Sequence, residues 1–134
     1  MIVCYRTAMR YLGIDYGSKR VGIAVSDESA KFALPLVVLP NNAGLVDGVE
    51  KLARENGVTH IVIGESRKYD MTANPIQEDI AEFKEHLDGR GYATHLELEF
   101  MTSQQAEREQ GKHAKIDASA AALILQSFLD KQPR

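Results

Sequence analysis

The alternation of apolar and polar positions along the first forty residues predicts three β-strands. Two strands, Tyr11–Tyr16 and Val21–Ser26, are apolar and β-branched, and a short turn that begins at Gly17 separates them. A third strand is expected at Phe32–Leu39. Pro35 within it indicates a sheet edge or a bulge, because proline cannot donate a backbone hydrogen bond. These strands are predicted to form an antiparallel group.

Helical spacing begins after the third strand. A helix is expected at Leu45–Glu55, and an apolar strand at His60–Gly64 is expected to be buried on both faces. The remaining expected elements are a helix that opens at Asn74-Pro75, a strand at Tyr92–Phe100, a short polar helix at Thr102–Gln110 and an apolar helix at Asp117–Leu129. Crossovers between parallel strands place helices on the faces of a mixed sheet, so the order predicts a layered α/β fold. Other α/β arrangements share this order.

Length and composition bound the class of protein. The chain has 134 residues, 44% hydrophobic and 26% charged, which is typical of one globular domain. The sequence contains no apolar run near the roughly 20 residues of a membrane span and no secretion signal, so a soluble cytoplasmic protein is expected. A lone cysteine, Cys4, predicts neither a disulfide nor a metal cluster. The formal charge of −3 is not that of a strongly basic nucleic-acid binder, so local charge must decide.

Three acids stand where the predicted elements end. Asp15 lies in an apolar strand, where a charge is costly unless it is paired or bound to a cation. Glu99 ends the fifth expected strand, and Asp117 opens the last helix. Oxygen ligands of this kind suit Mg²⁺ or Mn²⁺, and the absence of a His/Cys cluster argues against zinc. The three acids are therefore candidate metal ligands.

Each acid also has a structural interpretation. Asp15 is equally suited to start the hairpin turn through a side-chain hydrogen bond. Asp117 is a good helix N-cap, and taken alone that role is favoured. Glu99 taken alone is an exposed acid at a strand end, with Glu97 as a companion on the same strand face. The combination of the three, rather than any single one, favours a metal site.

Four segments carry a family resemblance: LGIDYGSKRVGIAVSD at Leu12–Asp27, ALPL at Ala33–Leu36, IVIG at Ile61–Gly64 and IDASAAALILQSFL at Ile116–Leu129. Together they resemble the YqgF/RuvX family of pre-16S rRNA nucleases, also described as Holliday junction resolvase-like proteins. The resemblance implies a ribonuclease H-like fold: a five-stranded mixed sheet with an antiparallel first trio, flanked by helices. It implies one domain over residues 11–130, with residues 1–10 and 131–134 as tails.

The resemblance implies that Asp15, Glu99 and Asp117 are catalytic acids that bind Mg²⁺ or Mn²⁺. The activity implied is hydrolysis of phosphodiesters in structured nucleic acid, with 5′-end processing of pre-16S rRNA in ribosome biogenesis as the expected role. Two segments depart from the family pattern. The usual Asp-Glu-Arg triplet is Leu98-Glu99-Phe100 here, and the loop expected after Gly64 shares only Asp70 with the family. Substrate contacts made by those family residues are not carried over.

Basic residues bracket the proposed site. Lys19 and Arg20 lie in the first turn and would ordinarily be a solvated pair. The candidate substrate contacts are Lys19, Arg20, Arg67, Lys68, Thr102, Arg108, Lys112, His113 and Lys115. No aromatic-rich RNA-reading motif accompanies them, so recognition of shape and backbone is expected rather than recognition of base edges.

Other functions remain open at this point. A Holliday junction resolvase acting on branched DNA is one alternative, and a catalytically weakened nucleic-acid binding module is another. The Asp15-Tyr16-Gly17 segment and its Ser/Lys turn also resemble the first phosphate loop of actin-like and sugar-kinase ATPases. Those proteins close two such domains over a nucleotide, and 134 residues supply only one. The chain is expected to act as a monomer or a homodimer.

Overall fold

The computed structural model describes residues 10–68, 76–101 and 118–132; for 65–68, 76 and 98–101 only the backbone is described. The elements are β1 (Arg10–Tyr16), β2 (Arg20–Ser26), β3 (Ala33–Pro40), α1 (Leu45–Glu55), β4 (Val58–Lys68), α2 (Ile76–Gly89), β5 (Ala93–Met101) and α4 (Ser119–Asp130). The helix expected at Thr102–Gln110 lies outside the described residues. No helix in the described ranges is long and apolar enough to cross a membrane.

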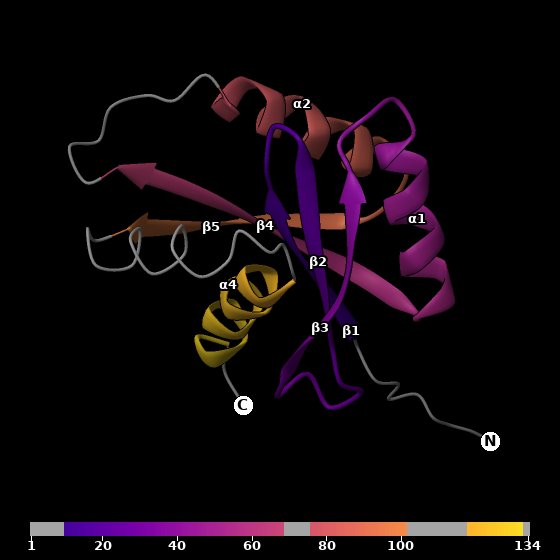
Figure 1. Ribbon diagram of the computed structural model, residues 1–134. Coiled ribbons are helices and arrows are strands. Elements are labelled where there is room, and N and C mark those ends of the chain that lie inside the picture. Colours follow the sequence, from indigo (N-terminus) through magenta and orange to yellow (C-terminus); the bar gives the residue numbers. More distant parts are fainter. Residues whose placement is uncertain (1–9, 69–75, 102–117, 133–134) are drawn as a thin grey trace.

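One five-stranded sheet forms the centre of the molecule, in the order β3-β2-β1-β4-β5. β1 pairs antiparallel with β2, and β2 with β3, whereas the β1–β4 and β4–β5 pairs are parallel. In Figure 1, α1 and α2 lie on one side of this sheet and α4 lies on the other. The mixed sheet with its antiparallel first trio is the arrangement that the sequence predicted.

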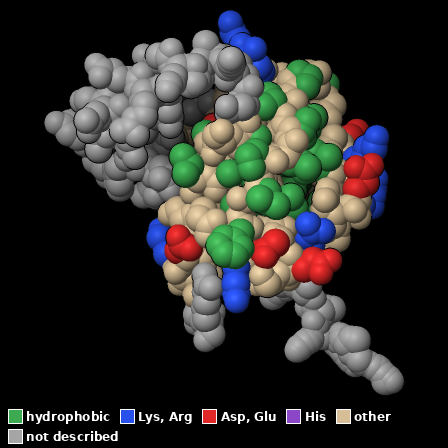
Figure 2. Space-filling view, turned by 60° about the horizontal axis from the view of Figure 1, so that its bottom comes forward, with side chains coloured by type: hydrophobic (Ala, Val, Ile, Leu, Met, Phe, Trp, Pro, Cys, Tyr) green, Lys and Arg blue, Asp and Glu red, His purple; other side chains and the backbone are tan. Residues whose placement is uncertain are grey.

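The edge position of β3 follows from its sequence. Pro35 pairs in register with Ala24, and a register shift lies between Ile23 and Ala24, so the predicted edge and the predicted bulge are both present. Large apolar side chains remain exposed on this strand, including Leu34 and Leu36. Figure 2 shows hydrophobic side chains gathered on one face of the molecule, with acidic and basic side chains around them.

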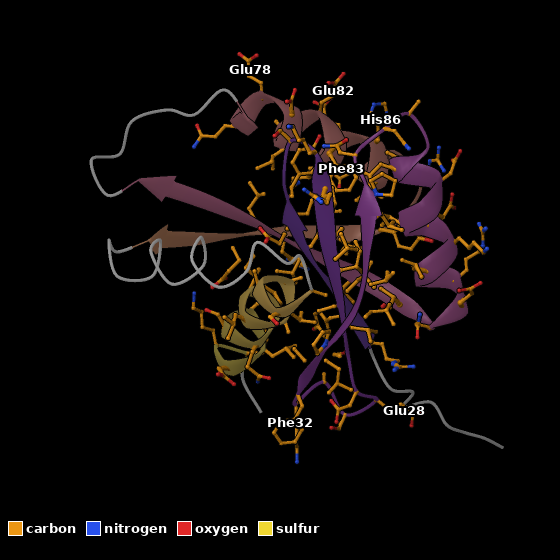
Figure 3. The ribbon with its side chains drawn as sticks, viewed as in Figure 1. Glu28, Phe32, Glu78, Glu82, Phe83 and His86 are labelled. Atoms are coloured by element: carbon orange, nitrogen blue, oxygen red, sulfur yellow. The ribbon has the colours of Figure 1, made fainter. Side chains whose placement is uncertain are left out.

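The face of the sheet under α1 and α2 carries the larger core. Leu12 and Ile14 of β1 are fully buried there, together with Val49 of α1. α2 contributes Ile80, Phe83 and Leu87. Figure 3 shows Phe83 directed toward the strands, while Glu78, Glu82 and His86 point outward from the same helix. These three buried residues recur at helical spacing, so one side of α2 packs on the sheet and the other side is exposed.

α4 packs closely on the opposite face because two strands present glycine to it. A Cβ atom added at Gly13 of β1 would lie 2.6 Å from Leu125 Cβ. A Cβ atom added at Gly64 of β4 would collide with Ile124 Cδ1. The helix thus rests on backbone rather than on side chains at these positions.

A ring cluster closes the other end of this interface. Tyr11 of β1 stacks on His60 of β4, with ring centres 5.0 Å apart, and Phe128 of α4 lies 5.0 Å from His95 of β5. His60 Nδ1 and His95 Nε2 are 3.4 Å apart, so one ring donates and the other accepts a hydrogen bond. Burial lowers the pKa of His95, and the nearby His60 and Lys84 lower it further.

This histidine pair predicts a stability change in mild acid. Unfolded His95 has an ordinary pKa of 6.5 and takes up a proton before the folded side chain does. The free energy of unfolding is therefore expected to fall as the pH decreases below about 6.5. Urea unfolding between pH 5 and 8 measures this. His95→Gln should flatten the dependence, while His86→Gln, at an exposed position on α2, should leave it unchanged. Parallel curves for the wild-type chain and His95→Gln would contradict the assignment.

Candidate nuclease site

Asp15 lies near the carboxyl end of β1, between two glycines. Its register partners are Gly22 of β2 and Gly64 of β4, so neither neighbouring strand places a side chain beside it in that row. Asp15 is two positions beyond Gly13, and side chains alternate along a strand, so Asp15 belongs to the sheet face that α4 covers. The carboxylate is partly buried. The predicted acid in an apolar strand is thus present, with a glycine as its immediate neighbour on each adjacent strand.

β5 carries two acids at positions of the same parity. Glu97 pairs in register with Gly64, which is itself the partner of Asp15, and Glu99 pairs with Ser66 two positions further along. The Glu97 side chain is buried and bonded to α4, whereas the side chain of Glu99 lies outside the described part of the molecule. Register therefore places the Glu99 position beyond the Asp15 row, at the end of the sheet where β1 stops.

The direction of α4 brings its first turn toward Asp15. Near the start of β1, Tyr11 contacts Phe128, from the end of the helix, with ring centres 5.8 Å apart. Further along, Gly13 faces Ala121, from the start of the helix. α4 therefore runs antiparallel to β1, and its amino end is nearest to the strand end that carries Asp15.

Asp117 itself lies outside the described residues. The helix begins at Ser119 rather than at Asp117, and the N-cap position is held by Ala118, which makes no side-chain cap hydrogen bond. The capping role considered for Asp117 is therefore wrong as to position. The prediction that the Asp15, Glu99 and Asp117 side chains converge stays a prediction, since only Asp15 has a described side chain.

The donor set can be compared with the needs of a hard cation. Within the described ranges no group of three or more His, Cys, Asp or Glu residues is arranged to hold an ion. Asp15 does fit such a role: it is a carboxylate at the end of a buried strand, flanked by glycines, on the face where the Glu99 position and the α4 amino end lie. Completing a site requires the acids whose side chains fall outside those ranges.

The turn after β1 carries the predicted bases. Lys19 and Arg20 are exposed there. Asn41, directly after β3, holds the turn: its side-chain amide donates to the Gly17 carbonyl at 2.8 Å, and its backbone N–H donates to the Lys19 carbonyl at 2.9 Å. We did not predict Asn41 from the sequence, although its place directly after a strand that ends in proline was a usable turn signal.

The second predicted basic segment is a strand rather than a loop. β4 and β5 continue past the end of β1, and in this extension Arg67 pairs with Phe100 and Lys68 with Met101. Figure 1 shows the two strands projecting side by side beyond the rest of the sheet. At about 3.3 Å per residue, these positions lie roughly 10–13 Å beyond the Asp15 row. The other candidate contacts, Thr102, Arg108, Lys112, His113 and Lys115, lie outside the described residues.

The outer surface of α2 has the opposite charge. Glu78, Asp79, Glu82 and Glu85 are exposed on this helix. Figure 3 shows Glu78 and Glu82 pointing into solvent on the side of α2 away from the strands. Such a surface repels phosphate. The strand ends near Asp15 are therefore better suited to an anionic substrate than the α2 side.

Solved structures define the class of fold. The Holliday junction resolvase of fowlpox virus superposes with a TM-score of 0.53 at 12% identity, covering 91% of this chain and 98% of that chain. Thermus thermophilus RuvC in complex with Holliday junction substrate gives a TM-score of 0.50 at 17% identity, covering 94% and 83%. The five-stranded sheet with its helices is thus the ribonuclease H-like fold that the resemblance implied.

Sequence relatives define the family. The family described as "RuvX: Holliday junction resolvase" matches residues 9–131. A protein of Opitutus terrae named "Putative pre-16S rRNA nuclease" is 36% identical over 92% of this chain and 93% of its own length. A protein of the same name from Pelotomaculum thermopropionicum is 35% identical over 94% and 90%. The chain belongs to the RuvX family.

Proposed function

We propose that this chain is a divalent-metal-dependent endonuclease that processes the 5′ end of pre-16S rRNA. The observation that carries the proposal is the placement of Asp15, between Gly22 and Gly64, at the strand end nearest to the amino end of α4. Family membership and the names of the relatives support the substrate class.

In this proposal Asp15, Glu99 and Asp117 hold Mg²⁺ or Mn²⁺. An ion held there would supply activation of water and stabilisation of the leaving oxygen of the phosphodiester. The protein's own part is positioning: Asp15 is fixed on a buried strand between two paired neighbours, and the turn braced by Asn41 presents Lys19 and Arg20 to the nucleic-acid backbone. Arg67 and Lys68, on the projecting strand, extend the proposed phosphate contacts away from the metal.

Branched DNA is the second candidate substrate. The fowlpox virus and Thermus thermophilus structures are described with Holliday junctions, and this chain shares their fold. A catalytically weakened binding module is the third possibility, because Leu98 and Phe100 stand where the family usually has an acid and an arginine. The three functions differ in what the purified chain cleaves.

A cleavage assay distinguishes these functions. The full chain is incubated with 5′-extended pre-16S rRNA or with a four-way DNA junction, in Mg²⁺, in Mn²⁺ or in EDTA. We expect metal-dependent cleavage of the RNA near the mature 5′ end. Cleavage of the junction alone would favour the resolvase, and tight binding without cleavage would favour the binding module. Cleavage that persists in EDTA would contradict the metal mechanism.

The braced turn gives a prediction about substrate binding. Lys19→Ala and Arg20→Ala should each weaken RNA binding. Each should also reduce the slope of log binding constant against log salt concentration by about 1, the change expected for loss of one phosphate contact. Asn41→Ala removes the side-chain hydrogen bond to Gly17 and should produce a smaller loss of the same kind. Filter binding at several salt concentrations measures this. Lys51→Ala, an exposed lysine on α1, is the matched control. An unchanged salt slope in both basic variants would remove the turn from the substrate surface.

A further inference from the structure

Glu97 is a buried carboxylate that the proposed chemistry does not use. It is 5% exposed, and its Oε2 accepts hydrogen bonds from Ser127 Oγ at 2.8 Å and Lys131 Nζ at 2.6 Å. A buried charge is costly unless a partner and hydrogen bonds compensate it. Here one partner, Ser127, lies in the last turn of α4, and the other, Lys131, is the C-cap residue of that helix. Glu97 therefore ties the edge strand β5 to the carboxyl end of α4.

Glu97 is separated from Asp15 although the two share a row of the sheet. Gly64 lies between them in register, and the space above Gly64 is filled by Ile124 of α4. The Glu97 carboxylate is bonded toward Ser127 and Lys131, at the far end of the helix from its first turn. The Glu97 carboxylate therefore anchors the carboxyl end of α4 and is not a fourth acid beside Asp15.

α4 contacts the sheet near the middle of the helix, at a point about which it could tilt. Ile124 rests on Gly64, with Ala118 six residues before it and Asp130 six residues after it. At 1.5 Å per residue each arm is about 9 Å long, so a tilt of about 10° moves the amino end by about 1.5 Å. Errors of about 1 Å in a catalytic site cost roughly a hundredfold in rate. A change in the contacts at one end of α4 would therefore also move its other end.

We infer that the Glu97–Lys131 ion pair positions the metal site by fixing the tilt of α4 against β5. Glu97 is two residues before Glu99 on β5, and α4 begins two residues after Asp117, so one ion pair connects the two segments that carry these acids. The inference rests on the proposed function, since it concerns the same ion. Glu97 and Lys131 are positioning residues and touch neither the ion nor the substrate.

Replacement of Lys131 distinguishes a positioning role of the ion pair from a direct effect of the Lys131 charge on cation binding. Loss of a positive charge from the neighbourhood of the acids would by itself strengthen binding of a cation. Loss of a positioning contact should weaken it, as loss of a partner behind a metal ligand does, by about tenfold or more. The two explanations therefore predict opposite signs for Lys131→Met.

The test measures Mn²⁺ binding to the full chain by electron paramagnetic resonance, with cleavage as a second readout. Lys131→Met should raise the Mn²⁺ dissociation constant at least about tenfold and raise the Mg²⁺ concentration for half-maximal cleavage, with KM for RNA unchanged. Lys131→Arg keeps the charge and should restore binding. Lys84→Met removes an exposed ion pair to Asp88, 3.2 Å long, and should change nothing.

A double variant covers the case in which Lys131→Met does not fold with Glu97 left unpaired. Glu97→Gln/Lys131→Met removes both charges, and it too should bind Mn²⁺ at least about tenfold more weakly. Wild-type affinity in a folded Lys131→Met or double variant would overturn the inference and leave the proposed nuclease intact. A wild-type chain that neither binds Mn²⁺ nor cleaves would overturn the proposed function and this inference with it.

Discussion

Asp15→Asn is expected to reduce metal-dependent cleavage by about a hundredfold or more while the chain stays folded. The amide keeps the size of the side chain but loses the charge that would anchor the ion. Because the row around Asp15 contains Gly22 and Gly64, the substitution creates no steric conflict. Cleavage of 5′-extended pre-16S rRNA under saturating Mg²⁺ measures the effect.

Stability in EDTA provides the second half of this test. If Asp15 is one of several clustered acids, Asp15→Asn removes repulsion, and the melting temperature should stay the same or rise. If Asp15 instead braces the hairpin, the free energy of unfolding should fall by about 0.5–2 kcal/mol with little change in cleavage. Asp79→Asn, an exposed acid on α2, is the matched control. A variant that melts earlier yet cleaves normally would overturn the metal role of Asp15.

Local patterns predicted the elements whose neighbours are close in sequence. The strand pair around Gly17 and the helix Leu45–Glu55 were predicted because alternation and helical spacing are strong there. The strand at His60–Gly64 was predicted too short. Its extension, Glu65 to Lys68, is polar and has no apolar alternation, and it is a strand because β5 supplies a parallel partner from another part of the chain. Pairing of this kind is not visible in a local window.

The candidate site residues differ in the same way in how clearly the sequence indicates them. Asp15 stands out because a charge in an apolar strand is locally anomalous. Glu97 was interpreted only as a companion of Glu99, because its partner Lys131 lies 34 residues away. A signal did exist: Ser127 and Lys131 are four residues apart, so they would share one side of the last predicted helix if it continued past Leu129. Asn41 was missed because turn residues are common and their partners are not written in the sequence.

The largest expected change in stability comes from Gly13→Ala. The new Cβ atom would lie 2.6 Å from Leu125 Cβ and 3.0 Å from the Ala121 carbonyl oxygen. Neither atom is the end of a flexible side chain, so α4 as a whole has to move away from β1. Overpacking of this kind costs about 1–3 kcal/mol, and the cost here should lie at the upper end or beyond because the obstacle includes backbone. Urea unfolding gives the free energy directly.

Gly64→Ala should cost less, although the same helix covers that glycine. The added Cβ atom meets first the terminal Cδ1 of Ile124, which can rotate, and then Ile124 Cγ1 at 2.9 Å and Cγ2 at 3.0 Å. Ile124→Val removes Cδ1 and keeps the other two atoms. Alone it should cost about 0.5–1.5 kcal/mol, and somewhat less in the Gly64→Ala background, because there it also relieves the part of the collision that Cδ1 makes. Gly89→Ala, where the new Cβ atom meets nothing within 4 Å, is the control and should be neutral or stabilising. Equal losses of stability in Gly13→Ala and Gly64→Ala, or additive effects of Gly64→Ala and Ile124→Val, would show that α4 is not held against the sheet by these contacts.

The same variants should differ in cleavage. Because the amino end of α4 lies toward Asp15, a folded Gly13→Ala chain should also lose cleavage, and Gly64→Ala/Ile124→Val should retain more of it.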